Sequence, residues 1–269
     1  MDSRLKQFFR QASDEGPHDS FHAVIPLHES PGLSWSEISK KIPTLPKGWH
    51  ELSRLPSKDR LEFTRDFWLT KLSYQVETHE SLEKFFASLD DVAVFATQKK
   101  FDDPFEPNLV YCLKESDGFF RGHPPIDAKG LQEIQELFAP YLPPSDYLAF
   151  LQIHDGFAKA TDCTGMMRAR QMREKYQAFQ RMLEQQDPMV TSIGTTVDPK
   201  TLIPFYESFG MPFFQCFWAE WYPEQEMGNV YYSTESKTIS DLFTSGASSE
   251  TMAFPTFVDW LTFYLERVV

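Results

Sequence analysis

His154 and Asp155 are the residues of this chain that could most directly perform acid–base chemistry. An imidazole titrates near neutral pH, and a neighbouring carboxylate can orient it as a general base. The two residues follow a predicted helix, whose end could expose the imidazole. Adjacent side chains usually point apart, however, and neither a nucleophile nor an oxyanion donor can be assigned. We therefore interpret the pair as the end of a helix, and a hydrolase centred on His154 is the third candidate function.

The turn between Glu220 and Glu226 is suited to binding rather than to catalysis. It combines two large aromatic side chains with three carboxylates, a composition typical of protein interfaces. The alternative is a solvated hairpin loop whose Trp221 is tucked into the core. The candidate binding residues in this turn are Glu220, Trp221, Tyr222, Glu224 and Glu226.

The other histidines show no motif for a metal or a cofactor. None of the seven histidines lies in an HExxH pattern, and the Gly-rich phosphate loops and the GxSxG elbow are also missing. A group of polar residues near the amino terminus could gather a metal, although solvated side chains are the favoured interpretation. The group consists of His18, His22, His28, Asp14, Glu15, Asp19 and Glu29. We expect no metal, no cofactor and no enzymatic activity.

The three cysteines, Cys112, Cys163 and Cys216, are widely spaced and include no CxxC pair. This usage suits a reducing compartment, and the apolar runs around Cys112 and Cys216 indicate core thiols. The amino terminus lacks the continuous apolar region of a signal peptide. No stretch approaches the roughly 18 apolar residues that a membrane span needs. We therefore expect a cytoplasmic protein without a membrane partner.

The chain is acidic, with a formal net charge of −13 and a pI of about 5.0. Residues 127–269 hold 19 acids against 10 Lys and Arg, a balance of −9, which leaves −4 for residues 1–126. Such a charge repels nucleic acid and anionic membranes, so a partner would be a basic protein. An acidic surface also keeps proteins soluble, and solubility is the simpler explanation.

The first part of the chain divides into an arm and a mixed portion. Residues 1–20 form a short amphipathic pattern followed by a polar break, which predicts a flexible arm. Residues 21–126 read as an α+β portion of unknown type. Helices are predicted at residues 35–41 and 57–74, the second with Ser57 as its cap, and a third helix begins near Ser81. Strands are predicted at residues 91–97 and 108–114, and they could form a hairpin.

The second part begins with a helix around Ile134, followed by prolines. Ser145 could cap the next helix, and Gly156 could end it with a left-handed backbone. A helical pattern follows from about Thr164, and strands are predicted within residues 202–221 and at 229–233. In the closing helix, from Phe254, Trp260 is spaced to dock on a sheet. These elements predict an α+β fold whose mostly antiparallel sheet is covered by helices.

This second part resembles the SUKH superfamily, in which a Leu-Pro pair precedes a Tyr-bearing helix and an Asn/Asp-Gly turn, followed by an Ile-Pro strand. The matching residues are Leu142, Pro143, Tyr147, Phe150, Leu151, Asp155, Gly156, Leu202, Ile203 and Pro204. The resemblance implies a SUKH-like domain at residues 127–269, without enzymatic chemistry. Members of the superfamily include bacterial immunity proteins that neutralise toxins and fungal regulators of cell-wall assembly.

The sequence thus predicts a protein-binding module, of immunity or regulatory type, that binds and modulates another protein, for which a basic toxin is one candidate. Asp155 joins the residues of the acidic turn as a candidate binding residue. An intracellular regulator or scaffold in cell-envelope physiology is the alternative function.

Overall fold

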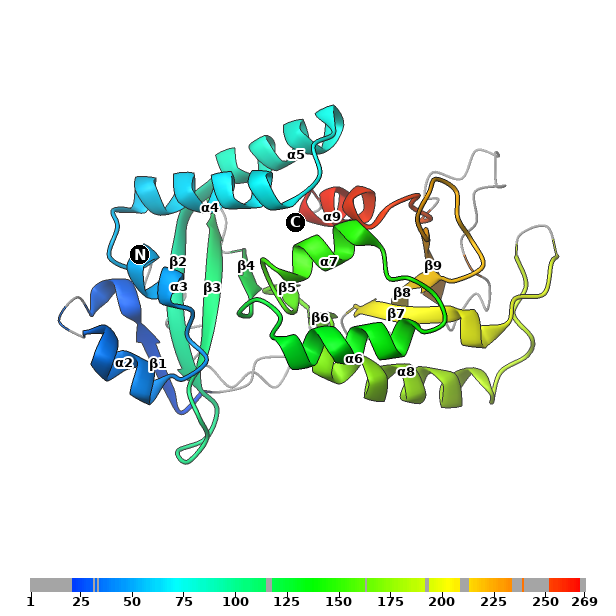
Figure 1. Cartoon of the computed structure of the whole chain (residues 1–269), viewed down its shortest axis with the longest axis horizontal. Helices are drawn as coiled ribbons and strands as arrows, with labels where there is room; N and C mark the ends of the chain where they lie inside the picture. Colours follow the sequence, from blue (N-terminus) through cyan, green and yellow to red (C-terminus); the bar gives the residue numbers. More distant parts are fainter. Residues whose placement is uncertain are drawn as a thin grey trace. The chain divides into compact units, whose positions relative to one another are not determined.

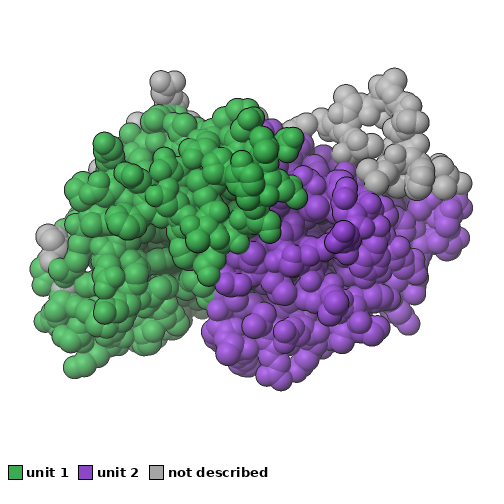
Figure 2. Space-filling model, turned by 45° about the horizontal axis from the view of Figure 1, so that its top comes forward, with its two compact units in different colours: residues 1–125, 153–163, 268–269 green, residues 126–152, 164–267 purple. Residues whose placement is uncertain are grey.

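A computed structural model describes residues 21–30, 32, 34–114, 118–162, 164–191, 194–208, 213–233, 239 and 252–266. The chain divides into two compact units, which Figure 2 shows in different colours. Unit 1 comprises residues 1–125, 153–163 and 268–269, and unit 2 comprises residues 126–152 and 164–267. The stretch that was expected as one domain, residues 127–269, therefore contributes residues 153–163 to unit 1. The predicted arm at residues 1–20 lies outside the described residues.

Unit 1 is built on an antiparallel sheet of five strands in the order β1-β2-β3-β4-β5 (Figure 1). The predicted hairpin is confirmed, because β2 pairs with β3 and places Val92 opposite Tyr111. The edge strand β5 follows two helices of unit 2 in the sequence, so the sheet is complete only after the chain has returned from unit 2. The strands are β1 (Ala23–Pro26), β2 (Leu89–Gln98), β3 (Glu106–Leu113), β4 (Phe119–Gly122) and β5 (Phe157–Lys159).

Helix α4 packs on this sheet and buries Trp68 completely. It begins at Ser57 as predicted, but Pro56 occupies the cap position, and the Ser57 hydroxyl donates to the Asp90 carbonyl instead. Helix α5 starts at Val76, before the predicted Ser81, and its buried residues already include Thr78. The helices of unit 1 are α2 (Trp35–Lys41), α3 (Lys47–Leu52), α4 (Ser57–Lys71) and α5 (Val76–Ala87), with a 3-10 turn at Leu27–Glu29.

A buried ion pair holds the first turn of α4 to the sheet. The Arg60 guanidinium donates to both carboxylate oxygens of Asp91 at 2.6 to 3.1 Å, and to the carbonyl oxygens of Val92 and Leu55 at 2.7 and 2.6 Å. Both charged side chains are buried. Because the pair is bidentate and further hydrogen-bonded, it fixes the start of α4 against β2.

Unit 2 is built on a second antiparallel sheet, in the order β6-β7-β8-β9. The strands expected within residues 202–221 and at 229–233 are confirmed, whereas the helix expected from Thr164 starts at Ala169. The reason is that Gly165 and Met166 pair with Glu207 and Tyr206 as a short strand. The strands are β6 (Gly165–Met166), β7 (Leu202–Glu207), β8 (Phe213–Trp218) and β9 (Asn229–Ser233).

Aromatic side chains fill the core of unit 2. Phe205 stacks on Phe217 with ring centroids 4.2 Å apart, and Trp260 meets Phe205 edge-on at 4.8 Å. Tyr147 and Phe257 join them, and all these rings are buried. The helices are α6 (Ala128–Phe138), α7 (Ser145–Leu151), α8 (Ala169–Leu183) and α9 (Phe257–Glu266), with a 3-10 turn at Pro199–Thr201.

The described residues thus form eight α-helices and two antiparallel sheets, so the α+β class is confirmed. Gly156 has a φ of 96°, the left-handed backbone expected of it after α7. Within the described part of the chain, no helix is long and apolar enough to cross a membrane.

Replacing Trp260 with Ala is expected to lower the free energy of unfolding by about 3 to 5 kcal/mol, because a large aromatic ring would leave a cavity between α9 and β7. Chemical denaturation measures this change. Tyr222→Ala is the control, since this tyrosine of unit 2 is largely exposed and its loss should change stability little. An unchanged denaturation midpoint for Trp260→Ala would mean that the apolar face of α9 is not docked on the sheet.

Candidate functional site

Unit 2 has a surface groove of about 690 Å³. Two segments form its walls: residues 140–145, between α6 and α7, and residues 222 and 225–227, between β8 and β9. Gln135 and Leu148 complete the lining. We call this feature the unit 2 groove. It contains two of the residues expected to bind a partner, Tyr222 and Glu226.

The first wall owes its shape to prolines. Pro140, Pro143 and Pro144 disfavour a continuing helix, so the chain after α6 makes a turn, closed by the Tyr141 N–H on the Phe138 carbonyl, and passes through Leu142 to Pro144 without regular structure before α7 begins. Leu142 lies between these prolines and is 81% exposed. Its exposed side chain adds apolar surface to the lining of the groove.

The second wall is the acidic loop, which we define as residues 219–228. Trp221 donates its backbone N–H to Trp218 and accepts from Gly228, which closes the loop at its base. The Trp221 ring lies so close to Gly228 that any Cβ at that position would collide with it. Trp221 is therefore part of the loop's own packing, but it is half-buried and not tucked into the core as the alternative interpretation held. The next residue, Tyr222, is 47% exposed and faces the groove.

Glu226 joins the two walls. Its carboxylate accepts hydrogen bonds from the backbone N–H of Ser145, at 3.0 Å, and from the Ser145 hydroxyl. Ser145 is the first residue of α7, where the unpaired N–H groups and the helix dipole favour a negative charge. Glu226 thus supplies the cap that Ser145 was expected to provide itself. Glu220 and Glu224, which are exposed, carry the remaining charge of the acidic loop.

Asp146 is a buried carboxyl group directly behind this cap. It accepts hydrogen bonds from the backbone N–H groups of Tyr147, at 2.7 Å, and of Val258 in the first turn of α9, at 2.8 Å. Burial raises the pKa of Asp146 to about 6, the two backbone donors oppose that rise, and the nearby charge of Glu226 adds to it. The residue therefore connects the beginnings of α7 and α9.

His154, the candidate acid–base residue, is completely buried in unit 1. Its Nδ1 lies 2.9 Å from the carbonyl oxygen of His123, which can only accept, so Nδ1 carries the proton. Its Nε2 then accepts from the hydroxyl of Tyr111 at 2.6 Å, and the Tyr111 oxygen accepts from Trp68 Nε1 at 3.0 Å. Burial lowers the pKa of His154 to about 4. The imidazole is neutral, engaged at both nitrogens and closed to any substrate.

Asp155 is also buried in unit 1, at 8% exposed, and its backbone N–H donates to the carbonyl of Pro124. We therefore leave it out of the proposed interface. Sequence reasoning missed Tyr141, Leu142 and Leu148 in the other wall of the groove. The only signal for them was the run of prolines, which predicts a loop but not its exposure.

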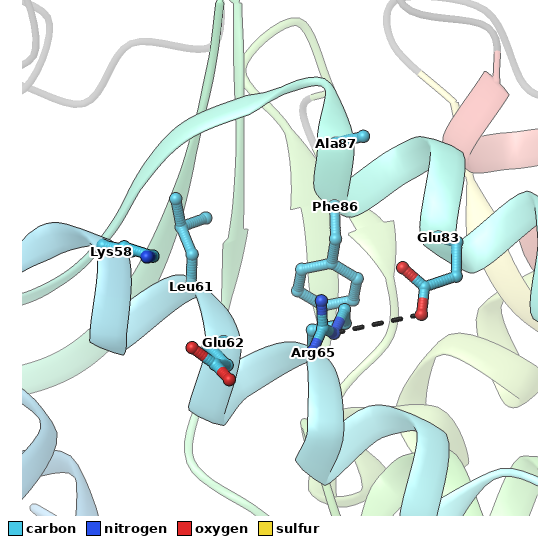
Figure 3. Close-up of a pocket in the computed structure, with 7 residues that line it drawn as sticks. All are labelled: Lys58, Leu61, Glu62, Arg65, Glu83, Phe86 and Ala87. Atoms are coloured by element: carbon cyan, nitrogen blue, oxygen red, sulfur yellow. Dashed lines mark ion pairs between the residues drawn. The ribbon is translucent and has the colours of Figure 1, made fainter.

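A second groove, of about 330 Å³, lies between α4 and α5 of unit 1 (Figure 3). Arg65 Nε lies 3.9 Å from a carboxylate oxygen of Glu83 across it, with the Phe86 ring beside the guanidinium. The remaining lining mixes Lys58 with Glu62. Because these charges balance and Arg65 is paired, the groove does not favour a ligand of either sign.

Among the described residues, no group of three or more His, Cys, Asp or Glu side chains could hold a metal ion. Of the proposed amino-terminal group, His22 packs edge-on against Phe101 and His28 is buried beside Phe95, while His18 lies outside the described residues. Burial raises the pKa of Cys112 to about 12 and that of Cys216 well above its usual value. Cys163 lies outside the described residues.

Comparison with known proteins identifies no relative: no protein-family model matches the chain, and no curated protein matches it.

The stability of unit 1 should fall as the pH is lowered from about 6.5 to about 4. In this window the unfolded chain protonates His154 and the folded chain does not, because the folded pKa is about 4. The difference between the unfolded and the folded pKa of His154 corresponds to about 3 kcal/mol in the free energy of unfolding. We expect the stability difference between wild type and His154→Gln to shrink by this amount on acidification, measured by urea denaturation.

The pKa of His154 can also be read directly from the NMR shift of its ring Cε1 proton. An imidazole that titrates near neutral pH in the folded chain would contradict its placement in a closed core, whatever the stability of the variant.

Proposed function

We propose that this chain is a non-enzymatic protein-binding module that binds a basic partner protein through the unit 2 groove. The observation that carries the proposal is the pairing of exposed apolar side chains with exposed carboxylates at one place. Leu142 and Tyr222 come from opposite walls of the groove, and Glu220 and Glu224 lie on the acidic loop.

The groove supports a protein partner rather than a small molecule. Its lining includes three prolines and two tyrosines, Glu226 is its one charged residue, and Leu142 and Tyr222 expose their side chains. Tyrosine is among the residues that contribute most to protein interfaces, since its ring buries a large area with few rotatable bonds. A leucine as exposed as Leu142 would gain the transfer free energy of its side chain on being covered, about 2 kcal/mol.

The charge of the chain supports a basic partner. The net charge of −13 attracts a positively charged protein within the screening length set by the ionic strength. Glu220 and Glu224 contribute two of these charges on the acidic loop, which forms one wall of the groove. Glu226 is engaged with Ser145 and is therefore assigned to the fold of the loop. Attraction of this kind chiefly raises the association rate.

The resemblance of residues 127–269 to the SUKH superfamily supports an immunity-type function, in which the partner is a toxin and binding takes place in the cytoplasm. Regulation or scaffolding in cell-envelope physiology is the second candidate, since the superfamily also includes cell-wall regulators. Affinity capture of the partner with the wild-type chain, followed by its identification, distinguishes these two functions. A basic toxin is expected only for the immunity-type function.

We expect Glu220→Lys combined with Glu224→Lys to slow association with the partner at least about tenfold at low salt, with a smaller effect near 1 M salt, where the Debye length is about 3 Å. The matched control is Glu174→Lys with Glu184→Lys, which makes the same charge change at two exposed positions, one in α8 and one at its C-cap, outside the groove lining. Surface plasmon resonance with the partner captured by the wild-type chain measures both rates.

Loss of the apolar contacts should act on dissociation instead. Leu142→Ser and Tyr222→Ala are each expected to raise the dissociation rate while leaving circular dichroism unchanged, because both side chains are exposed. Partners that bind all these variants as well as they bind the wild type would refute the groove as the interface.

A further inference from the structure

We propose that the outer face of helix α4 is a docking surface for α4 of a second copy of this chain, with the two helices antiparallel. This inference goes beyond the proposed function, because α4 belongs to unit 1 and the proposed partner site belongs to unit 2.

Helix α4 exposes two phenylalanines on one face. Phe63 is 62% exposed and Phe67 is 43% exposed, and their spacing of four residues places them side by side along the helix. The adjacent face, with Thr64 and Trp68, is the one that packs on unit 1. The surface face of a helix normally carries polar residues, so a pair of exposed aromatic rings indicates a surface that is covered by a partner.

The same row of side chains ends in opposite charges. Asp59, Phe63, Phe67 and Lys71 follow one another at intervals of four residues, the row that forms a ridge on a helix surface. Asp59 stands in the first turn and Lys71 is the last residue of the helix. The Lys71 ammonium lies 5.7 Å from the centroid of the Phe67 ring and therefore beside the apolar pair.

This ridge is complementary to itself when it is turned around. The row is symmetric about residue 65, so a two-fold axis there brings Phe63 of one copy against Phe67 of the other. The same rotation brings Asp59 of each copy to Lys71 of the other. Two-fold dimers need a patch of this kind, in which one residue contacts a second and the second contacts the first in return. Antiparallel helices also align their dipoles favourably.

The pairing is expected to be weak. Two phenylalanines on each side, with the exposed Tyr74 and Val76 beyond the end of the helix, bury less area than the roughly 1,200 Å² of a stable complex. Association should therefore depend on concentration. We expect sedimentation velocity of the full chain to show a monomer at low micromolar concentration and a growing dimer fraction at several hundred micromolar.

Phe63→Glu combined with Phe67→Glu should abolish the dimer. Each single change, Phe63→Glu or Phe67→Glu, has its matched control in Phe101→Glu, which places one carboxylate at a phenylalanine of unit 1 that is 73% exposed but lies outside α4. A monomeric wild type at all concentrations, a dimer that survives the double change, or an equal loss in the control would each overturn the proposal.

A charge exchange tests the antiparallel geometry itself. Asp59→Lys alone and Lys71→Asp alone should each weaken the dimer, because each creates two like-charged contacts. The double variant should restore it, since every contact is again between opposite charges. Circular dichroism of each variant verifies that α4 is intact. Failure of the double variant to regain the dimer, with α4 helical, would overturn the antiparallel pairing.

Discussion

The buried hydrogen-bond chain from Trp68 through Tyr111 and His154 to the His123 carbonyl is the constraint on which unit 1 depends. The side chains of Trp68, Tyr111 and His154 are closed to water, so their donors and acceptors must find partners inside the fold. The direction of every bond follows from the carbonyl at the end. Gly122 completes the arrangement, because a Cβ there would collide with the imidazole.

This series of buried hydrogen bonds explains why the polypeptide returns to unit 1 after α7. His154 has to reach Tyr111, and β5 follows it at once as the fifth strand of the sheet. A fragment of residues 127–269 would hold β5 without that sheet.

One buried group in each unit responds to acid, and the two respond in opposite directions. Between about pH 4 and 6 the folded unit 2 binds more protons than the unfolded chain, because the pKa of Asp146 is raised to about 6. Acid therefore stabilises unit 2 in the window in which protonation of His154 opposes the fold of unit 1.

Patterns of neighbouring residues predicted most of the elements, and contacts between distant residues account for what was missed. Periodicity located α2, α4, α6, α9 and the central strands, because an apolar face repeats within each element. The predicted caps at Ser57 and Ser145 were wrong, because Pro56 and Pro144 take the cap positions. At Ser145 the carboxylate that accepts from the helix start comes from Glu226, which is distant in the sequence. The role of His154 was hidden because Tyr111 lies 43 residues away in the sequence. Exposure of Leu142 depends on tertiary packing, which no local pattern reports.

The acidic loop divides its residues between those that pack against the protein and those that stay exposed in the proposed interface. Trp221 and Glu226 face the protein, one against Gly228 and the other on the first turn of α7, and together they fix the loop at both ends. Tyr222 and Glu224 lie between these anchors and remain exposed. A loop that is already held in place loses little conformational freedom when a partner covers it, so more of the contact energy remains as affinity. In the proposed interface, the residues that do not touch the partner would therefore contribute to binding by holding those that do.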